Sequence, residues 1–282
     1  MRRLLQKRAR CQGHLMTNYK RVFTFGCSFT QYWWPTWANI IATDLGIPAQ
    51  NWGIGGVGNV AIQHRMVECD LKNTFTEDDL ILVLWSSWAR EDRYRNYAWR
   101  VGGSVFNNDF YDKDFVDKYW SEQNDIVKNA TAIISANKMF NIQYQAHWVD
   151  YQNSLNDYSP AVPPITSHKF QYLTEALPQK NMVEHSHTEG NDWNKLIKDG
   201  HPNVLQHLKF AEQFSNGIGT ELKTSTIKLY TDAHHHVKSI LQDTKETHSN
   251  KDIHRHRKDI YCYFKKYLSA QIPPREFNDE EL

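Results

Sequence analysis

The sequence has few cysteines, no long apolar run and almost no net charge, and each absence excludes a class of protein. Its 282 residues include four cysteines that lie far apart without paired spacing, so a disulfide framework is excluded and reduced thiols are expected. These are Cys11, Cys27, Cys69 and Cys262. No stretch approaches the apolar length of a membrane span. The net charge of +1 gives no reason to expect nucleic acid or an anionic membrane surface as a partner.

The sequence does contain enough apolar material for a folded domain, since 40% of its residues are hydrophobic and 13% are aromatic. This length fits one large domain, or one domain with an appendage. The first twenty residues are basic but lack the apolar region and the cleavage site of a secretory signal. We therefore expect residues 1–20 to be a loosely ordered segment of a cytoplasmic protein, with a basic arm for RNA as the alternative.

Strand-like and helix-like segments alternate through the first half of the chain. Residues 79–85 form a continuous Leu/Ile/Val run, which is typical of a strand buried on both faces of a parallel sheet. The alternation predicts an α/β fold with helices on both faces of a mostly parallel sheet. The expected strands are 22–26, 48–52, 79–85 and 140–148, and the expected helices are 34–45, 60–71 and 115–137.

The alternation of strand-like and helix-like segments stops in the second half of the chain. Residues 150–198 are rich in proline, asparagine and histidine, and we expect an irregular insertion that lies near the functional site. A helix over 204–214 is expected to close an α/β domain spanning 21–216. Apolar positions at helical spacing then predict two amphipathic helices in a C-terminal extension, 217–282. These helices could pack on the core or join copies of the chain into an oligomer or a larger assembly.

Three short motifs follow one another along the chain. Residues 25–30 read Phe-Gly-Cys-Ser-Phe-Thr, which places Ser28 just beyond the first strand. Residues 51–59 hold four glycines before a predicted helix, and residues 199–202 read Asp-Gly-His-Pro before the closing helix. Each motif taken alone is compatible with an ordinary turn or helix start.

In this order the motifs resemble those of the SGNH hydrolases, the GDSL esterase and lipase superfamily. The resemblance covers roughly residues 21–215 and rests on about twenty of them. It implies a three-layer, flavodoxin-like fold and an ester-cleaving enzyme that needs neither a metal nor a cofactor.

The resemblance implies a role for each motif. Ser28 would attack an acyl ester, and His201 would take the serine proton and pass it to the leaving alcohol. Asp199 would orient the imidazole and stabilise its charged form. The backbone N–H groups of Ser28 and Gly56 would form the oxyanion hole, where glycine lets the backbone approach the substrate.

The motif after the third strand departs from the family pattern. SGNH proteins carry an asparagine there as a third oxyanion donor, whereas Ser87 stands nearest to that position. Asn59 and Arg90 are the other candidate donors. Because the loss of one donor typically costs a hundredfold or more in rate, this substitution puts the activity in doubt but not the fold.

Two further departures concern the first and last motifs. Cys27 stands where aspartate is usual; it could itself be a nucleophile, but we expect its side chain to point into the fold. One residue separates Asp199 from His201, where the family commonly has two. Asp192 is therefore an alternative partner for the imidazole.

Aromatic and histidine-rich segments could also carry function. Trp33, Trp34 and Trp88 are predicted to bind substrate, since flat amphipathic rings can stack on sugar faces, although core packing explains such residues equally well. The run His234–His236 suggests a metal site, but consecutive residues on a helix point in different directions, so we expect a solvated face and no metal.

The sequence therefore predicts a serine hydrolase that cleaves an acyl ester, with an O-acetylated carbohydrate as the substrate class. The alternative is a catalytically impaired SGNH-like protein that binds glycans or takes part in an assembly. Acyl transfer onto a sugar would use the same residues and is not distinguished from hydrolysis.

Overall fold

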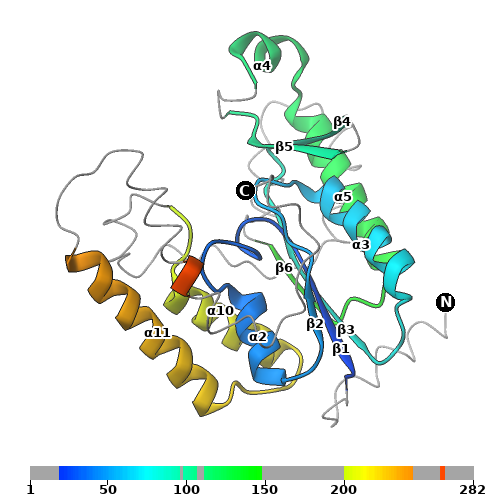
Figure 1. Ribbon diagram of the computed structural model, residues 1–282. Coiled ribbons are helices and arrows are strands. Elements are labelled where there is room, and N and C mark those ends of the chain that lie inside the picture. The colour runs from blue at the N-terminus through cyan, green and yellow to red at the C-terminus, as the bar shows by residue number, and fades with distance from the viewer. Residues whose placement is uncertain (1–18, 96–97, 107–110, 148–199, 244–260, 264–282) are drawn as a thin grey trace, which may run out of the picture.

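The computed structural model describes residues 19–95, 98–106, 111–147, 200–243 and 261–263 (Figure 1). Four parallel strands form the central sheet in the order β2-β1-β3-β6. Their bounds are Arg21–Phe25 for β1, Ala49–Asn51 for β2, Asp79–Trp85 for β3 and Tyr144–His147 for β6. The predicted α/β class and the four predicted strands are confirmed, with shifts of a few residues at their ends.

Helices cover both faces of the sheet, which gives three layers (Figure 1). Helices α2 and α10 pack together on one face, and α3 and α5 pack together on the other. Helix α11 lies outside α2 and α10 and contacts both. Their bounds are Trp37–Leu45 for α2, Asn59–Asn73 for α3, Glu122–Met139 for α5, Val204–Gly217 for α10 and Thr224–Asp243 for α11.

Strand β3 is the centre of the core, because all seven of its residues are buried. At its amino end Asp79 forms a two-point ion pair with Arg21 on β1, with N–O distances of 2.7 and 2.6 Å. Burial acts to raise the pKa of Asp79, but hydrogen bonds from Arg21 and Thr76 prevail and hold the pKa below its ordinary value. This pair fixes the register of β1 against β3 at the edge opposite the candidate site.

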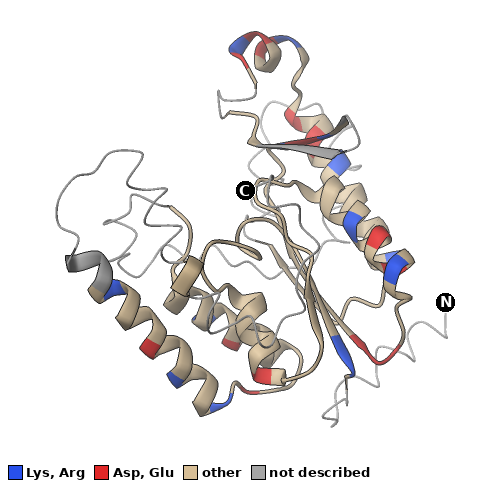
Figure 2. Cartoon of the chain, viewed as in Figure 1, with Lys and Arg blue, Asp and Glu red and all other residues tan. Residues whose placement is uncertain are grey.

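In the central sheet, the strands carry charged residues only at their amino ends, whereas the helices carry charges along their length (Figure 2). Within the described residues, no helix has the length and apolar character needed to cross a membrane. The helix α11 of the C-terminal extension is docked on the core. The hydroxyl groups of Tyr230 and Thr43 lie 2.7 Å apart, and the N–H of Lys223 donates to Asp44 over 2.8 Å.

The long helix predicted over 115–137 is two helices, α4 (Lys113–Tyr119) and α5. The chain is extended at Trp120, and Ser121 starts a new helix by accepting a hydrogen bond from the N–H of Asn124. Both halves have helical sequences, so the break depends on this cap.

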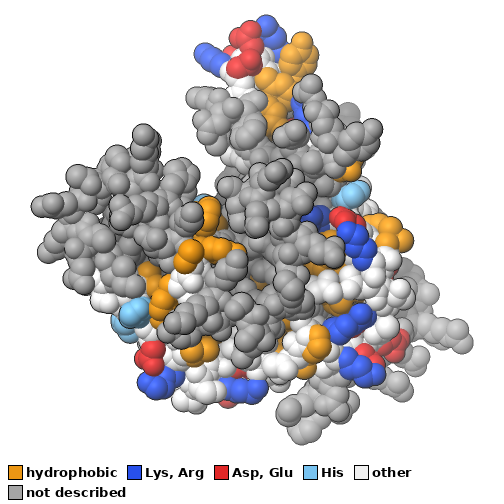
Figure 3. Space-filling model, viewed as in Figure 1, with side chains coloured by type: hydrophobic (Ala, Val, Ile, Leu, Met, Phe, Trp, Pro, Cys, Tyr) orange, Lys and Arg blue, Asp and Glu red, His pale blue; other side chains and the backbone are white. Residues whose placement is uncertain are grey.

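An antiparallel hairpin that the sequence analysis missed lies between β3 and α4. Its strands are β4 (Arg90–Arg95) and β5 (Ala98–Ser104), and together with α4 it protrudes from the three layers (Figure 1). Its first strand is highly charged and lacks the apolar alternation that indicates strands. Phe106 and Tyr119, 56% and 76% exposed, belong to this protruding part, where Figure 3 shows hydrophobic surface beside charged side chains.

Candidate active site

Ser28 lies in a tight turn directly after β1. The carbonyl of Cys27 accepts hydrogen bonds from the N–H groups of Thr30 and Gln31, at 2.8 and 3.1 Å, which closes the turn. The Cys27 side chain is fully buried in the core, as expected, so the chain presents Ser28 on the other side. Ser28 is 5% exposed and lies at the carboxyl edge of the sheet, where open α/β folds place their ligands.

His201 reaches the same place from the segment just before α10. Its Nε2 lies 3.0 Å from the Oγ of Ser28, although the two residues are 173 positions apart. The position of His201 depends on the start of α10, where the Asn203 side chain accepts from the Gln206 N–H and the Gln206 side chain accepts from the Asn203 N–H. The structure therefore brings together the two side chains that the motifs named as nucleophile and base.

Aromatic side chains hold the imidazole. The ring of Tyr32 stacks on His201 with a centroid distance of 3.9 Å and an interplanar angle of 21°. Phe29 meets the imidazole edge-on at 5.6 Å. The Nε1–H of Trp34 donates to the carbonyl of Pro202 over 2.8 Å, which fixes the loop next to the imidazole. Tyr32 and Phe29 were not predicted, because a sequence gives no signal that pairs them with a residue so distant.

Trp34 is therefore not the exposed substrate-binding residue that we expected. Its ring is buried, because the indole fills the space between the Ser28 loop and the Pro202 loop and uses its N–H on a backbone carbonyl. Its side chain supports the loop that carries His201.

This role predicts the effect of Trp34→Phe. Losing the buried hydrogen bond to Pro202 should cost about 1 kcal/mol of stability and, by loosening His201, lower kcat for an aryl ester about tenfold. Trp37→Phe is the matched control, since the buried Trp37 Nε1–H has no hydrogen-bond partner within the described residues. Steady-state kinetics and thermal unfolding of both variants measure the effect; an equal kcat in the two variants would contradict it.

The glycine-rich loop after β2 lies beside Ser28. The N–H of Ile54 donates to the carbonyl of Gly26, and a Cβ added to Gly55 would lie 3.9 Å from the Cβ of Ser28. Gly56 has a φ of +80°, a conformation that favours glycine. Among the described residues, no hydrogen bond engages the backbone N–H of Ser28 or of Gly56. Within those residues, therefore, neither N–H group has a protein acceptor.

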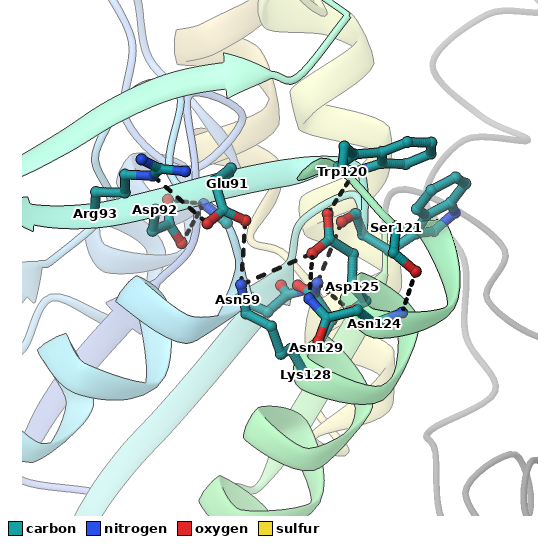
Figure 4. Close-up of polar contacts among 12 residues, drawn as sticks. Asn59, Glu91, Asp92, Arg93, Trp120, Ser121, Asn124, Asp125, Lys128 and Asn129 are labelled. Carbon is teal, nitrogen blue, oxygen red and sulfur yellow. Dashed lines mark hydrogen bonds and ion pairs between the residues drawn. The ribbon is translucent and has the colours of Figure 1, made fainter. Parts of the chain in front are cut away.

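The other expected oxyanion donors are placed differently. The Nδ2 of Asn59 donates to the carbonyl of Ser86 and to the Oδ1 of Asn129, and its Oδ1 accepts from the Ser86 N–H, so the amide is fully used in holding the strand end. Asn59 and Asn129 are both labelled in Figure 4. Arg90 donates to the carbonyl of Val57 over 2.9 Å. Neither side chain is free for a substrate. Ser87 is half-buried, and its hydroxyl accepts from the N–H of Ala89 over 3.2 Å, which leaves its own O–H to be donated.

The remaining candidates are partly outside the described residues. Asp199 and Asp192 both lie outside them, so the carboxylate that would orient His201 stays a prediction. Trp33 and Trp88 are half-buried. The first meets the ring of Tyr261 edge-on at 6.0 Å, and the second stacks on Trp120 at 6.1 Å.

The histidine run on α11 is not a uniformly solvated face. His234 is buried, whereas His235 and His236 are exposed, because successive helix positions point in different directions. In the part of the chain that the structure describes, no group of three or more His, Cys, Asp or Glu side chains could hold a metal ion.

A second histidine, His207 on α10, is fully buried near His201. Neither of its ring nitrogens has a hydrogen-bond partner within the described residues. Burial is the main cause that lowers the pKa of His207 to about 3, and the charge of His201 acts in the same direction.

This burial predicts a pH dependence of stability. The unfolded chain takes up a proton on His207 near pH 6.5 and the folded chain only near pH 3, so between these values the unfolded state binds more protons. The free energy of unfolding should therefore fall by about 2 kcal/mol between pH 7.5 and pH 5 through this group alone. Urea denaturation at both pH values should show that the free energy of unfolding depends less on pH in His207→Phe than in the parent. The control is His235→Phe, at an exposed position; an unchanged dependence in His207→Phe would contradict the prediction.

Comparison with known proteins adds little to this site. No model of a known protein family matches the chain, and no curated protein matches it. Among solved structures, a gut microbial diltiazem-metabolizing enzyme is similar over 74% of this chain, with 14% identity and a TM-score of 0.38. The match covers 48% of that enzyme, so this chain spans about half its length. A likeness of this size defines neither a family nor an activity.

Proposed function

We propose that this protein is a serine hydrolase of the SGNH type that cleaves an acyl ester. The observation that carries the proposal is the 3.0 Å contact between the Oγ of Ser28 and the Nε2 of His201 at the carboxyl edge of a parallel sheet. A serine hydroxyl becomes a nucleophile when a base accepts its proton, and this distance is a hydrogen bond. The strand order agrees with a flavodoxin-like sheet, in which ligands bind at this edge.

The reaction follows from these positions. His201 takes the proton of the Ser28 hydroxyl through Nε2 while Oγ bonds to the acyl carbon, and the carbonyl oxygen becomes an oxyanion. The N–H groups of Ser28 and Gly56 donate to that oxyanion. His201 then protonates the leaving alcohol as the bond between carbon and alcohol oxygen breaks. Water attacks the acyl-serine with His201 again as base, which releases the carboxylic acid and restores Ser28. Asp199 orients the imidazole throughout.

The substrate class we propose is an O-acetylated carbohydrate. Ser28 is only 5% exposed, which favours a small acyl group such as acetyl. Trp33 and Trp88, both half-buried, offer ring surface on which a sugar could stack.

A second candidate function is binding without catalysis, as a glycan-binding or assembly protein on the same scaffold. It is favoured by the position after β3, where Ser87 stands in place of an asparagine donor and Asn59 does not replace it. Two N–H donors and a serine hydroxyl would then have to stabilise the oxyanion.

Covalent labelling decides between the two. We expect the folded protein to hydrolyse p-nitrophenyl acetate and to be inactivated by a fluorophosphonate, with the adduct mapped by mass spectrometry to Ser28. The reagent needs both an activated serine and an oxyanion hole, so it tests the site without requiring the natural substrate. A folded protein with no esterase activity and no adduct on Ser28 would overturn the hydrolase and leave the binding protein.

A further inference from the structure

The unpredicted hairpin β4–β5 contacts the start of α3, directly after the glycine-rich loop, through the carboxylate of Asp92. The N–H of Gly58 donates to both oxygens of Asp92, at 2.8 and 3.0 Å, and the N–H of Ala61 donates to one of them at 3.1 Å. Gly58 is the N-cap of α3 and has no side chain to satisfy these donors, so Asp92 caps the helix from a different element (Figure 4).

Arg90 holds the other side of the same peptide group. Its Nη1 donates to the carbonyl of Val57, and this carbonyl shares one planar peptide with the N–H of Gly58 that Asp92 accepts. Two side chains on β4 thus bind both ends of one peptide plane. A Cβ on Gly58 would lie 2.8 Å from an oxygen of Asp92 and 3.1 Å from the Cβ of Arg90, so the fit leaves no room for a side chain there.

We propose that Asp92, together with Arg90, is a positioning residue that sets the orientation of the Gly56 N–H for the oxyanion. This inference rests on the proposed function. The clamped peptide, between Val57 and Gly58, lies two peptides beyond the one between Gly55 and Gly56 that carries the donor N–H, so fixing it restricts the end of the donor loop. Gly55 and Gly56 have no Cβ to restrict the loop by themselves, and Gly56 has a positive φ. An oxyanion donor works only if it is held in place before the reaction.

The electrostatics agree with a held carboxylate. Burial is the main cause that raises the pKa of Asp92 to about 6, and Glu91 acts with it, whereas the N–H groups of Gly58 and Ala61 and the charge of Arg90 act against the rise. Above that pH the group is a carboxylate that accepts all three hydrogen bonds. An amide in its place would present an NH2 group to backbone N–H donors and lose at least one of them.

Kinetics of Asp92→Asn and Asp92→Ala test the inference. We expect kcat for p-nitrophenyl acetate to fall about 10- to 100-fold with KM within about twofold, because the lost interaction acts on the transition state. Asp79→Asn is the matched control: it removes a buried carboxylate that also accepts a backbone N–H, but at the opposite edge of the sheet. It should lower the melting temperature and leave kcat within about twofold. A merely structural role for Asp92 predicts that its variants behave like this control.

Two further measurements keep the inference testable. Arg90→Met removes the other half of the clamp and should lower kcat in the same direction, which matters if the Asp92 variants do not fold. Hydrogen exchange can be measured without any enzymatic activity. The backbone amides of residues 54–58 should exchange faster in Asp92→Ala than in the parent, whereas their exchange rates in Asp79→Asn should equal those of the parent. Unchanged exchange and unchanged kcat in the clamp variants would overturn the inference. If the parent is not an esterase, the proposed function fails, and exchange alone still decides whether Asp92 holds this loop.

Discussion

Replacing Ser28 by alanine is expected to lower kcat for p-nitrophenyl acetate by about a thousandfold or more. The substitution removes the hydroxyl oxygen that lies 3.0 Å from the Nε2 of His201, and with it the covalent intermediate. The backbone N–H donors and the base remain, so the residual rate measures what they achieve without a nucleophile. Steady-state kinetics at saturating ester, with thermal unfolding to confirm an intact fold, give the result.

The control for this prediction is Ser215→Ala. Ser215 is a buried serine on α10 and lies outside the candidate site. Its variant should keep kcat within about twofold of the parent, since surrounding packing is largely preserved. Equal rates in Ser28→Ala and the parent would remove the proposed mechanism, because any ester hydrolysis would then come from another group.

Gly26→Ala is expected to be the most destabilising small substitution near the site. A Cβ at this position would lie 2.0 Å from the Oγ1 of Thr30 and 2.8 Å from the carbonyl of Leu84. Thr30 is fully buried, and the carbonyl belongs to β3, so neither can withdraw without disturbing the Ser28 turn or the central strand. We expect the free energy of unfolding to fall by about 3 kcal/mol or more.

Gly46→Ala separates this clash from ordinary backbone strain. Gly46 ends α2 with a φ of +66°, and a Cβ there meets nothing within 4 Å. Its variant should lose only about 1 kcal/mol. Urea denaturation of both variants gives the comparison, and Thr30→Ala in the Gly26→Ala background should restore part of the loss. Similar losses at the two glycines would show that the turn after β1 is less tightly packed than its geometry indicates.

The central sheet was predictable because its signal is local. The run at 79–85 has no polar residue after Asp79, and a strand buried on both faces requires this, so β3 was placed with its observed bounds. The hairpin β4–β5 was not predictable. Its charged residues are stabilised by partners elsewhere in the chain, such as the N–H groups of Gly58 and Ala61 that bind Asp92, and no local pattern reports such partners.

The candidate site likewise has a part that the sequence predicted and a part that it did not. The motifs named Ser28, His201 and Gly56 because their order along the chain resembles that of the SGNH hydrolases, although each motif alone is compatible with an ordinary turn. They could not show that the Asn59 side chain is hydrogen-bonded to Ser86 and Asn129, or that Trp34 is buried and hydrogen-bonded to Pro202. Those roles depend on which loops lie side by side at the sheet edge.

The sequence by itself determined the class of fold, and its motifs named the candidate nucleophile and base through their resemblance to a known family. These are properties of short segments, in which apolar periodicity and turn residues act over a few positions. Only the tertiary structure decided that Ser28 and His201 meet, and that a charged hairpin binds the backbone at the start of α3. Both are contacts between segments remote along the chain, and the packing of the whole domain sets their distances.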